Sequence, residues 1–360
     1  MGGAEKWMIE MAEFVSRSTE AKIVDVAPQL SNFYGRLVLK RTFDDNSQQH
    51  RKYEFGDITS LSASSFLPFS TNWHAARNIF TTSQIIYARM ELLEVLLCVY
   101  FGGFGVFKKL VAGLHMSIFY EQPANLTQLL HNLVYTSAIF RHVLAACKKV
   151  HVINQRDQKY LLQNFRLTNV FFLPNGTDVP KVIPIYRQPI DKRLHIIFVG
   201  ELSLRKGIDT ILETIKISPA DFQFAIIGQG PLKKEVMSQA KKSPNLHFYG
   251  YVKNRQLEEL YRTADVIFFP SRAEAFGLVM IEAMANGLMV VNSPEVTLHL
   301  PDYIEKTVAQ RDPQEYVAAF KEILARKNKK LIDRKKINQY CYQHFSKEII
   351  YPKFVSEVLG

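Results

Sequence analysis

Two glutamates in the second half of the chain flank the predicted start of a helix. Glu274 and Glu282 are separated by seven residues that include Phe276-Gly277-Leu278. The first N–H groups of a helix have no partner within it, and with the positive end of the helix dipole they bind anions such as phosphate. Gly277 lets a ligand approach the backbone closely. A carboxylate one turn further on can bind the hydroxyl groups of a ribose, so the pattern favours nucleotide-sugar recognition.

The elements around these glutamates must hold them at one edge of a sheet. The apolar run Val266–Phe269 predicts a strand, residues 270–273 predict a polar turn, and Leu288–Val291 predicts a second strand after the helix. Strands that alternate with helices form a parallel sheet, and ligands bind at the carboxyl ends of its strands. We therefore expect the site at the turn after the first of these strands.

Five motifs together resemble a known family. The segment EAFGLVMIEA resembles the E-x7-E signature of the family 4 retaining glycosyltransferases, and FLPNGTD, FVGELSLRKGID, FAIIGQGPL and LHFYGYV occur in the order that this family shows. Two glutamates alone would equally suit an ordinary solvated helix face, whereas five motifs in order do not arise by chance. The resemblance covers nearly the whole chain and implies the GT-B fold, an α/β fold of two Rossmann-like domains facing each other across a cleft.

The resemblance also implies an activity. A sugar would pass from a nucleotide-diphosphate sugar to a glycan, lipid-linked or other acceptor with retention of the anomeric configuration, and neither a cofactor nor a metal ion is expected. His115, Lys206 and Glu274 are the implied catalytic residues. The residues implied to bind the donor are Gly3, Arg205, Lys206, Tyr251, Val252, Glu274, Ala275, Phe276, Gly277, Leu278 and Glu282.

Two cations precede a helix predicted to begin near Ile208. From this loop, Lys206 and Arg205 can reach a pyrophosphate, the lysine as a mobile charge and the arginine as a bidentate fork. The Lys-Gly pair matches the family. Many relatives have arginine where this chain has Glu201, and Arg205 is expected to replace that contact.

His115 follows a buried strand predicted over Leu110–Leu114, where an open α/β sheet places its ligands. In the family a histidine after this strand reaches the transferred sugar, which makes His115 the candidate. The alternative is a histidine that only satisfies a loop hydrogen bond. The other histidines, including His151, are expected to be structural or surface groups. Residues 85–100 are periodic enough to predict a helix.

The chain begins with a glycine turn and an amphipathic helix. In the family a similar turn follows a first β-strand, and its glycine amides face the transfer site, which implicates Gly3. No strand precedes the turn here. The first strand of the N-terminal domain is therefore expected to be missing. Either the natural chain begins some ten or more residues upstream of Met1, or this chain is stabilised in an unusual way.

Four prolines between residues 174 and 189 predict a linker. The expected domains are an N-terminal acceptor-side domain over residues 1–183 and a C-terminal nucleotide-sugar-binding domain over residues 184–345. Residues 346–360 resemble the family's last helix, which crosses back to the first domain. In the second domain, Gly228 and Gly230 are expected to be turn residues, and Pro231 is expected to begin a helix.

Composition limits the partners. The net charge of +11 and the pI near 9.4 suit nucleic acid, anionic membranes or phosphorylated substrates, but no nucleic-acid motif accompanies them. The basic run Ala325–Lys336 is expected to be the solvated face of a late helix. No apolar run is long enough to span a bilayer, and the three cysteines suit a reducing compartment. We expect a cytoplasmic enzyme in peripheral contact with the inner, anionic face of the cell membrane.

Three other classes of protein remain open. A glycoside hydrolase would also use two carboxylates, although the phosphate-binding helix start argues against it. A sugar-nucleotide epimerase of the GT-B fold would keep the donor site and transfer nothing. A non-catalytic descendant that binds glycans or acts as a scaffold would fit Glu201 and the missing first strand.

Overall fold

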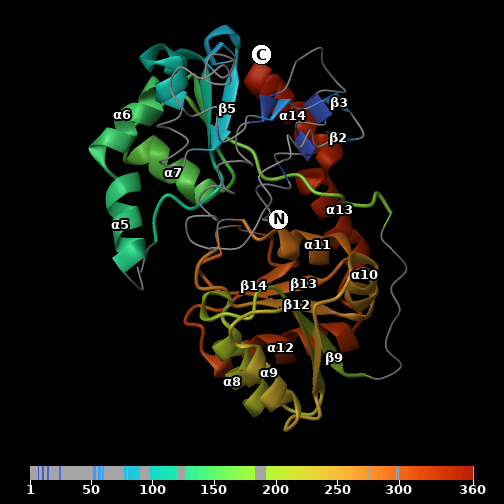
Figure 1. Ribbon diagram of the computed structural model, residues 1–360. Helices are drawn as coiled ribbons and strands as arrows, with labels where there is room; N and C mark the ends of the chain where they lie inside the picture. The colour runs from blue at the N-terminus through green and yellow to red at the C-terminus, as the bar shows by residue number, and fades with distance from the viewer. Residues whose placement is uncertain are drawn as a thin grey trace. The chain divides into compact units, whose positions relative to one another are not determined.

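The protein, described by a computed structural model, divides into two units (Figure 1). Unit 1 contains residues 1–173 and 351–360, and unit 2 contains residues 174–350. The domain boundaries predicted after residues 183 and 345 stay predictions. The structure describes residues 7, 10–11, 14–15, 24–25, 52–53, 56–57, 59–60, 77–78, 80–89, 98–120, 126–182, 192–274, 276–296, 298 and 300–359.

Unit 1 contains a parallel sheet with the strand order β5-β6-β7-β8 in its described part. These strands are β5 (Ile86–Arg89), β6 (Leu110–Leu114), β7 (Lys149–Val152) and β8 (Val170–Phe172). Every residue of β6 is buried, as its apolar sequence predicts for a central parallel strand. Its carboxyl end leads directly into His115.

The helix predicted over residues 85–100 is wrong in its first part. Residues 86–89 form β5, which pairs in parallel with β6, with Ile86 opposite Leu110. The run Ile-Tyr-Ala combines β-branched and aromatic side chains, and pairing with a buried strand outweighs a helical period over so few residues. Helical residues are described from residue 98 to residue 102.

Short paired strands also lie nearer the N-terminus. The structure describes β1 (Val24–Asp25), which pairs in parallel with β4 (Thr59–Ser60). β2 (Lys52–Tyr53) and β3 (Gly56–Asp57) form an antiparallel pair.

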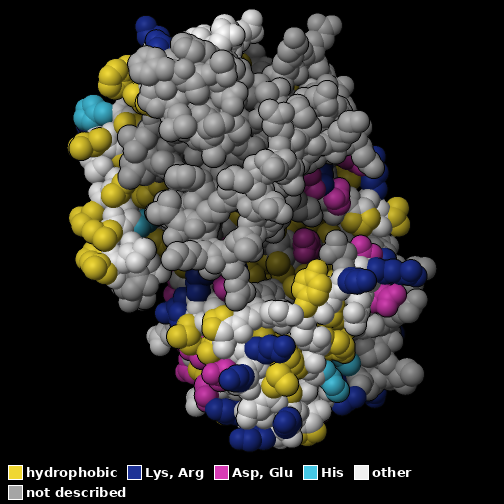
Figure 2. Space-filling view, viewed as in Figure 1, with side chains coloured by type: hydrophobic (Ala, Val, Ile, Leu, Met, Phe, Trp, Pro, Cys, Tyr) yellow, Lys and Arg dark blue, Asp and Glu magenta, His cyan; other side chains and the backbone are white. Residues whose placement is uncertain are grey.

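The helices of unit 1 begin with side-chain caps where the sequence offers them. Ser137 caps α6 (Ala138–Ala146) and Asn154 caps α7 (Gln155–Gln163), each accepting a backbone N–H of the first turn. The short helix η2 (Phe104–Lys109) packs with α6 beside the sheet. By contrast, α5 (Leu126–Tyr135) leaves several leucines exposed, and Figure 2 shows hydrophobic side chains along this edge.

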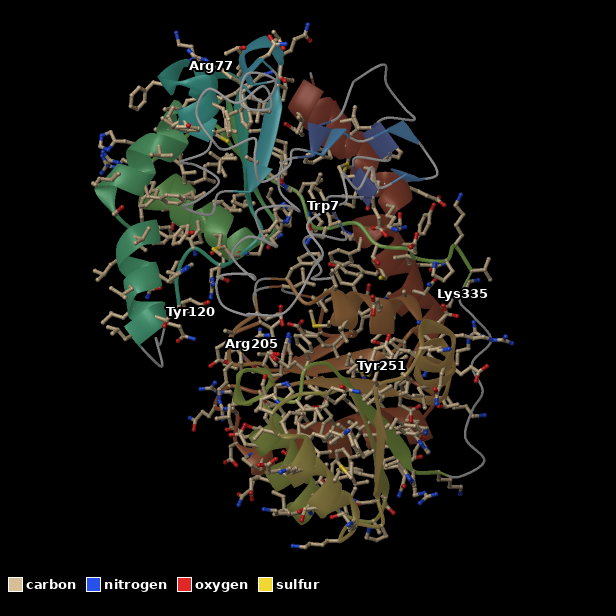
Figure 3. The ribbon with its side chains drawn as sticks, in the orientation of Figure 1. Trp7, Arg77, Tyr120, Arg205, Tyr251 and Lys335 are labelled. Atoms are coloured by element: carbon tan, nitrogen blue, oxygen red, sulfur yellow. The ribbon has the colours of Figure 1, made fainter. Side chains whose placement is uncertain are left out.

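The N-terminal segment and the last helix share the core of unit 1. The described residues of the predicted first helix are helical, and Trp7, labelled in Figure 3, is buried. Its ring meets that of Phe354, in α14 (Lys347–Leu359), edge-on with 5.3 Å between the centroids. The Tyr351 hydroxyl donates to Glu10 at 3.1 Å. Helix α14 lies within the segment predicted as the final helix, and its residues from Tyr351 on belong to unit 1.

Unit 2 is built on a six-stranded parallel sheet with the order β11-β10-β9-β12-β13-β14. In chain order this is 3-2-1-4-5-6, the arrangement of dinucleotide-binding domains. From β9 the strand order runs outward in one direction through β10 and β11, and from β12 it runs outward in the other, so the switch point lies between β9 and β12. Ligands of such sheets bind beyond the carboxyl ends of the strands at this switch point. The strands are β9 (Leu194–Val199), β10 (Phe222–Ile227), β11 (Leu246–Gly250), β12 (Val266–Phe269), β13 (Met289–Asn292) and β14 (Glu305–Thr307).

The strands and helices of unit 2 follow the sequence closely. Predicted strand Val266–Phe269 is β12, and α8 begins at Ile208 as expected. Gly228 and Gly230 lie in a connection, as expected. Pro231 was expected to begin the next helix, but α9 begins two residues later, at Lys233. The helices are η3 (Leu204–Lys206), α8 (Ile208–Ile217), α9 (Lys233–Ala240), α10 (Asn254–Thr263), α11 (Leu278–Ala285), α12 (Pro313–Asn328) and α13 (Arg334–Phe345).

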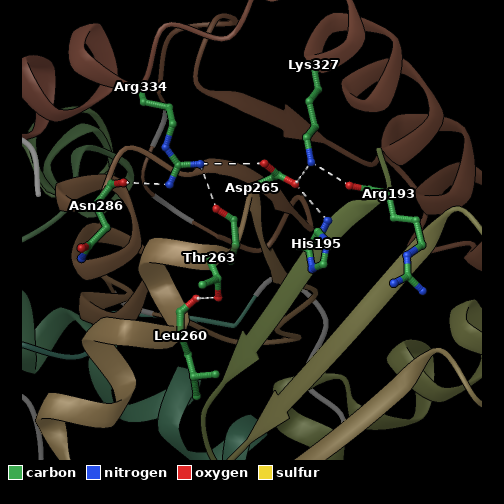
Figure 4. A network of polar contacts seen from close by, with 9 residues as sticks. Arg193, His195, Leu260, Thr263, Asp265, Asn286, Lys327 and Arg334 are labelled. Carbon is green, nitrogen blue, oxygen red and sulfur yellow. Dashed lines mark hydrogen bonds and ion pairs between the residues drawn. The ribbon is translucent and has the colours of Figure 1, made fainter. Parts of the chain in front are cut away.

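A buried polar network ties the amino ends of β9 and β12 to α12 and α13 (Figure 4). Asp265 accepts from Lys327 Nζ at 2.7 Å and from the backbone N–H of His195 at 3.0 Å, and Arg334 lies 3.9 Å away. The side chain of Lys327 is only 11% exposed. The interpretation of the basic run as a solvated face is therefore wrong for two of its members, because they neutralise a buried carboxylate.

Candidate functional site

The loops after β9 and β12 pack on each other at the switch point of unit 2. The backbone N–H of Arg272 donates to the carbonyl of Arg205 at 2.8 Å, and its guanidinium donates to the carbonyl of Leu204 at 2.7 Å. The same guanidinium pairs with Asp209 in the first turn of α8. These contacts hold the segment before α8 against the segment before α11.

Gly207 makes this close packing sterically feasible. Its φ is +75°, and a Cβ atom there would lie 2.2 Å from the carbonyl oxygen of Pro270. Any other residue would strain the backbone and force the two loops apart. The Lys-Gly pair therefore has a structural reason: the glycine allows the two loops to pack closely, and the lysine before it pairs with Glu274 of the other loop.

Lys206 and Glu274, far apart in the sequence, form an ion pair between the two loops. Each side chain is 16% exposed, and Lys206 Nζ also lies 5.3 Å from the centre of the Phe269 ring. Because the ammonium group is largely removed from water, its charge acts more strongly on neighbouring groups than the charge of a surface lysine does. Two of the three predicted catalytic residues thus meet at the expected edge of the sheet.

Helix α11 begins at this same edge without a side-chain cap. Its N-cap residue, Gly277, has φ +81° and ψ 56°, a left-handed conformation that favours glycine. Because no side chain caps the first N–H groups of α11, an anion could bind them. A Cβ atom at Gly277 would lie 3.3 Å from the Phe269 ring, so a larger residue would also crowd β12. Phe276 is buried, and Leu278 begins the helix.

Glu282 lies within α11, and its charge reaches a tyrosine that the sequence did not single out. Tyr261 of α10 is buried, and its hydroxyl has no hydrogen-bond partner. Burial raises the pKa of Tyr261 well above its usual value, and the charge of Glu282 raises it further. The phenol therefore stays protonated and can donate a hydrogen bond. Only three-dimensional packing reveals it, because no motif surrounds Tyr261.

The remaining predicted donor contacts of unit 2 are more exposed. Arg205 pairs with Glu201 at 3.3 Å, and both side chains are about half exposed. Such a pair is weak in water, so Arg205 remains able to exchange partners. Tyr251 and Val252 follow β11, and the Tyr251 side chain is exposed (Figure 3). Their roles, like those of the other predicted site residues, stay predictions.

In unit 1, His115 belongs to a hydrogen-bonded cluster that the sequence did not predict. The Tyr87 hydroxyl lies 2.7 Å from His115 Nε2 and 2.7 Å from His151 Nδ1. His151 Nε2 lies 2.8 Å from the carbonyl oxygen of Leu173. The Trp7 ring packs on His115 with 4.7 Å between the centroids.

The chemistry of these groups fixes the direction of each bond. The Leu173 carbonyl can only accept, so His151 carries a proton on Nε2. Burial lowers the pKa of His151 to about 4, so at neutral pH its Nδ1 accepts. The single proton of the Tyr87 hydroxyl therefore goes to His151, and its oxygen accepts from Nε2–H of His115. In a neutral His115 ring, the basic nitrogen is then Nδ1.

The cluster depends on a glycine in β6. Gly113 pairs with His151 across β6 and β7, and a Cβ atom on Gly113 would lie 2.2 Å from the Tyr87 hydroxyl. His151 was expected to be a structural or surface group, and this expectation missed its hydrogen bond with the Tyr87 hydroxyl, which also bonds His115. A histidine alternating with buried valines in a parallel strand was the available signal, because a buried imidazole needs partners.

Two predicted site residues, Gly3 and Ala275, lie outside the described residues. Within the described part of the chain, no group of three or more histidine, cysteine, aspartate or glutamate residues could hold a metal ion. The three cysteines, Cys98, Cys147 and Cys341, are buried. No helix among the described residues is both long and apolar enough to cross a membrane.

Comparison with known proteins relates unit 2 to one family. Residues 185–344 match the sequence profile of the family described as glycosyl transferases group 1. An uncharacterized 41.2 kDa protein of the cps region of Klebsiella pneumoniae is 36% identical over 101 residues, 28% of this chain and 27% of that protein. Mannosylfructose-phosphate synthase of Agrobacterium fabrum is 28% identical over 181 residues, 44% of this chain and 39% of that protein. The chain thus spans less than half the length of these curated relatives.

The fold is shared over nearly the whole chain. The structure of Anabaena HepE in complex with UDP superposes with a TM-score of 0.72 at 15% sequence identity, covering 99% of this chain and 96% of that one. At this identity the likeness shows the fold alone. The chain has the predicted fold class, that of the GT-B glycosyltransferases.

Proposed function

We propose that the protein is a retaining glycosyltransferase that uses a nucleotide-diphosphate sugar and needs no metal ion. The observation that carries this proposal is the meeting of Lys206, Glu274 and the uncapped start of α11 at the switch point of a dinucleotide-type sheet. The family match over residues 185–344 supports the same donor class. The HepE structure contains UDP, which supports a nucleoside diphosphate as the group bound.

The main chemical task would be to stabilise the leaving diphosphate. As the bond between the anomeric carbon and the phosphate oxygen breaks, negative charge grows on the phosphate and positive charge on the sugar. Lys206 and the first N–H groups of α11 would face the phosphate, an electrostatic effect often worth about 3–4 kcal/mol per group. Lys206 would then leave Glu274 for the diphosphate, which frees the carboxylate to bind sugar hydroxyls.

Glu282 and His115 complete the proposed machinery. Glu282 would hold the ribose hydroxyl groups, with the buried Tyr261 hydroxyl within range of its charge. His115 would contact the transferred sugar, and the bond from His115 Nε2–H to Tyr87 would orient its ring.

The acceptor and the place of action are also proposals. We propose a glycan or lipid-linked acceptor and a cytoplasmic enzyme in peripheral contact with the inner face of the cell membrane. The net charge of +11 supports contact with anionic lipid.

A panel of nucleotide sugars, followed by thermal shift and by release of nucleoside diphosphate, tests the proposal. One donor should stabilise the wild type and release diphosphate when an acceptor is present. Glu282→Gln should lose the stabilisation, whereas Glu235→Gln, an exposed glutamate on α9, should keep it. Diphosphate release that is equally fast without acceptor would indicate a hydrolase. Interconversion of the free sugar nucleotide would indicate an epimerase.

A non-catalytic descendant is the second candidate, because Glu201 places a negative charge 3.3 Å from the guanidinium of Arg205. That carboxylate would repel a diphosphate approaching Arg205. A wild type that binds the donor without turnover, together with a Glu201→Arg variant that regains turnover, would support this candidate.

A further inference from the structure

Helix α5 of unit 1 turns an apolar stripe towards solvent. Its leucines at 126, 129, 130 and 133 have the spacing i, i+3, i+4 and i+7, so they share one face, and all four are exposed. Leu126 is 69% exposed and Leu133 is 63% exposed. In most helices of globular proteins this spacing marks the face that packs on the core. Helix α5 instead carries that face outside.

The opposite face of α5 is fixed to unit 1 by specific contacts. The imidazole of His131 lies 2.9 Å from the carbonyl oxygen of Ser117. The side chain of Asn132 donates to the carbonyl of Tyr120 and accepts its backbone N–H, each at 2.8 Å. Tyr135 is buried. Rotation of α5 to bury its leucines would break these bonds, so the exposure of the stripe is part of the fold.

The apolar surface extends to the start of α6. Ile139, in the first turn of that helix, is 78% exposed, and α5 and α6 pack together. Figure 2 shows hydrophobic side chains gathered along the edge occupied by these two helices. We call this surface the leucine face and define it by Leu126, Leu129, Leu130, Leu133 and Ile139. Apolar side chains grouped in this way mark an interaction surface more often than isolated ones do.

The segment that contains the leucine face is basic. Between residues 98 and 157 the chain has six basic residues and two acidic residues, Glu121 and Asp157, and Asp157 is buried. Lys108, Arg141 and Lys148 of this segment are exposed. An apolar stripe together with cations complements an anionic bilayer, where leucines enter the acyl boundary and cations attract the headgroups. A second copy of this chain would bring the same positive charge to the contact, which disfavours self-association.

We propose that the leucine face docks on an anionic lipid surface, with α5 lying in the plane of the interface. The proposal deepens the peripheral membrane contact proposed above by naming the surface that makes it. Its test measures lipid binding without any sugar donor, so its outcome does not depend on whether the protein transfers sugar.

The experiment is flotation of the full-length chain with vesicles of phosphatidylcholine, with and without added phosphatidylglycerol. The double variant Leu126→Gln/Leu133→Gln changes two exposed side chains that contribute little to the core. The matched control, Ile217→Gln/Leu331→Gln, changes two exposed apolar residues of unit 2. A further variant, Arg141→Glu/Lys148→Glu, reverses two exposed charges of the basic segment.

The wild type and the control should bind anionic vesicles, and more weakly at high salt because the charges are screened. The leucine variant should bind at least about tenfold more weakly, since two leucines lose their burial in the bilayer. The charge variant should lose its preference for phosphatidylglycerol.

Several results would overturn the proposal. Equal vesicle binding by the wild type and the leucine variant would show that another surface makes the contact. No binding by the wild type at low salt would remove the membrane as the partner. Sedimentation that shows a wild-type dimer, absent in the leucine variant and without lipid binding, would assign the face to self-association. A thermal melt of each variant, with a midpoint near that of the wild type, controls for misfolding.

Discussion

Replacing Asp265 with asparagine should destabilise unit 2 by about 3–5 kcal/mol. The carboxylate has a side-chain exposure of only 5% and neutralises Lys327 at 2.7 Å, with Arg334 at 3.9 Å. Without its charge, two buried cations lose their carboxylate, while Lys327 keeps the carbonyl of Arg193 and Arg334 keeps that of Ala264. Removing one partner of a buried pair costs this much because the remaining charges are uncompensated.

The size of the effect makes it easy to measure. In a unit of 150–250 residues, a change of 1 kcal/mol moves the melting temperature by about 2–4 °C, so a loss of 3 kcal/mol gives about 6–12 °C. Both tryptophans, Trp7 and Trp73, fall within unit 1. Far-UV circular dichroism reports both units, and tryptophan fluorescence reports unit 1. The shift should therefore be larger in the dichroism signal.

Asp221→Asn provides the matched control, because Asp221 is exposed, and its unfolding free energy should stay within about 0.5 kcal/mol of the wild type. The double variant Asp265→Asn/Lys327→Met should cost less than the sum of the single variants, because it removes both partners of the pair. If Asp265→Asn melted within about 2 °C of the wild type, the network would not stabilise the fold as argued.

Two further predictions concern unit 1. Tyr87→Phe removes the hydroxyl that accepts from His115 Nε2, so the ¹⁵N chemical shifts of the His115 ring should change as its tautomer is released, whereas Tyr100→Phe, at an exposed tyrosine, should leave them unchanged. Unaltered His115 shifts in Tyr87→Phe would refute the assigned direction of the bonds. The pKa of His151 is lowered from 6.5 to about 4 by burial, so the folded state binds fewer protons than the unfolded state between these values. Stability contributed by neutral His151 is complete above pH 6.5 and should fall by about 1.4 kcal/mol per unit as the pH drops towards 4. In His151→Gln this slope, followed by tryptophan fluorescence, should be flatter; equal slopes would show that His151 does not titrate as a buried neutral group.

Unit 2 was largely predictable because its local signals agree with its packing. The run Val266–Phe269 is apolar, of strand length and followed by a turn, and it forms β12 with the same bounds. Gly207 and Gly277 both have left-handed backbones and directly precede α8 and α11, and α8 begins at the predicted Ile208. The E-x7-E spacing placed Glu274 before α11 and Glu282 within it.

The errors arose where long-range contacts decide the structure. Residues 86–89 form a strand because β6 lies beside them, which no local pattern reveals. Lys327 and Arg334 are part of a basic run and have the composition of a solvated face, yet Asp265, far away in the sequence, draws them inside. Pairing of strands brings Tyr87 and His151 to His115, and packing of helices brings Tyr261 near Glu282. A single sequence does not show which residues far apart in the chain meet in the fold.

The most direct test of the central claim is calorimetric titration of the protein with UDP, GDP and ADP. In the proposed site the diphosphate binds Lys206 and the start of α11, and the ribose binds Glu282. One nucleotide should bind the wild type, Glu282→Gln should weaken it at least about tenfold, and Glu235→Gln should not. If a nucleotide bound the wild type and Glu282→Gln with equal affinity, the site would lie elsewhere and the proposed role of α11 would be contradicted.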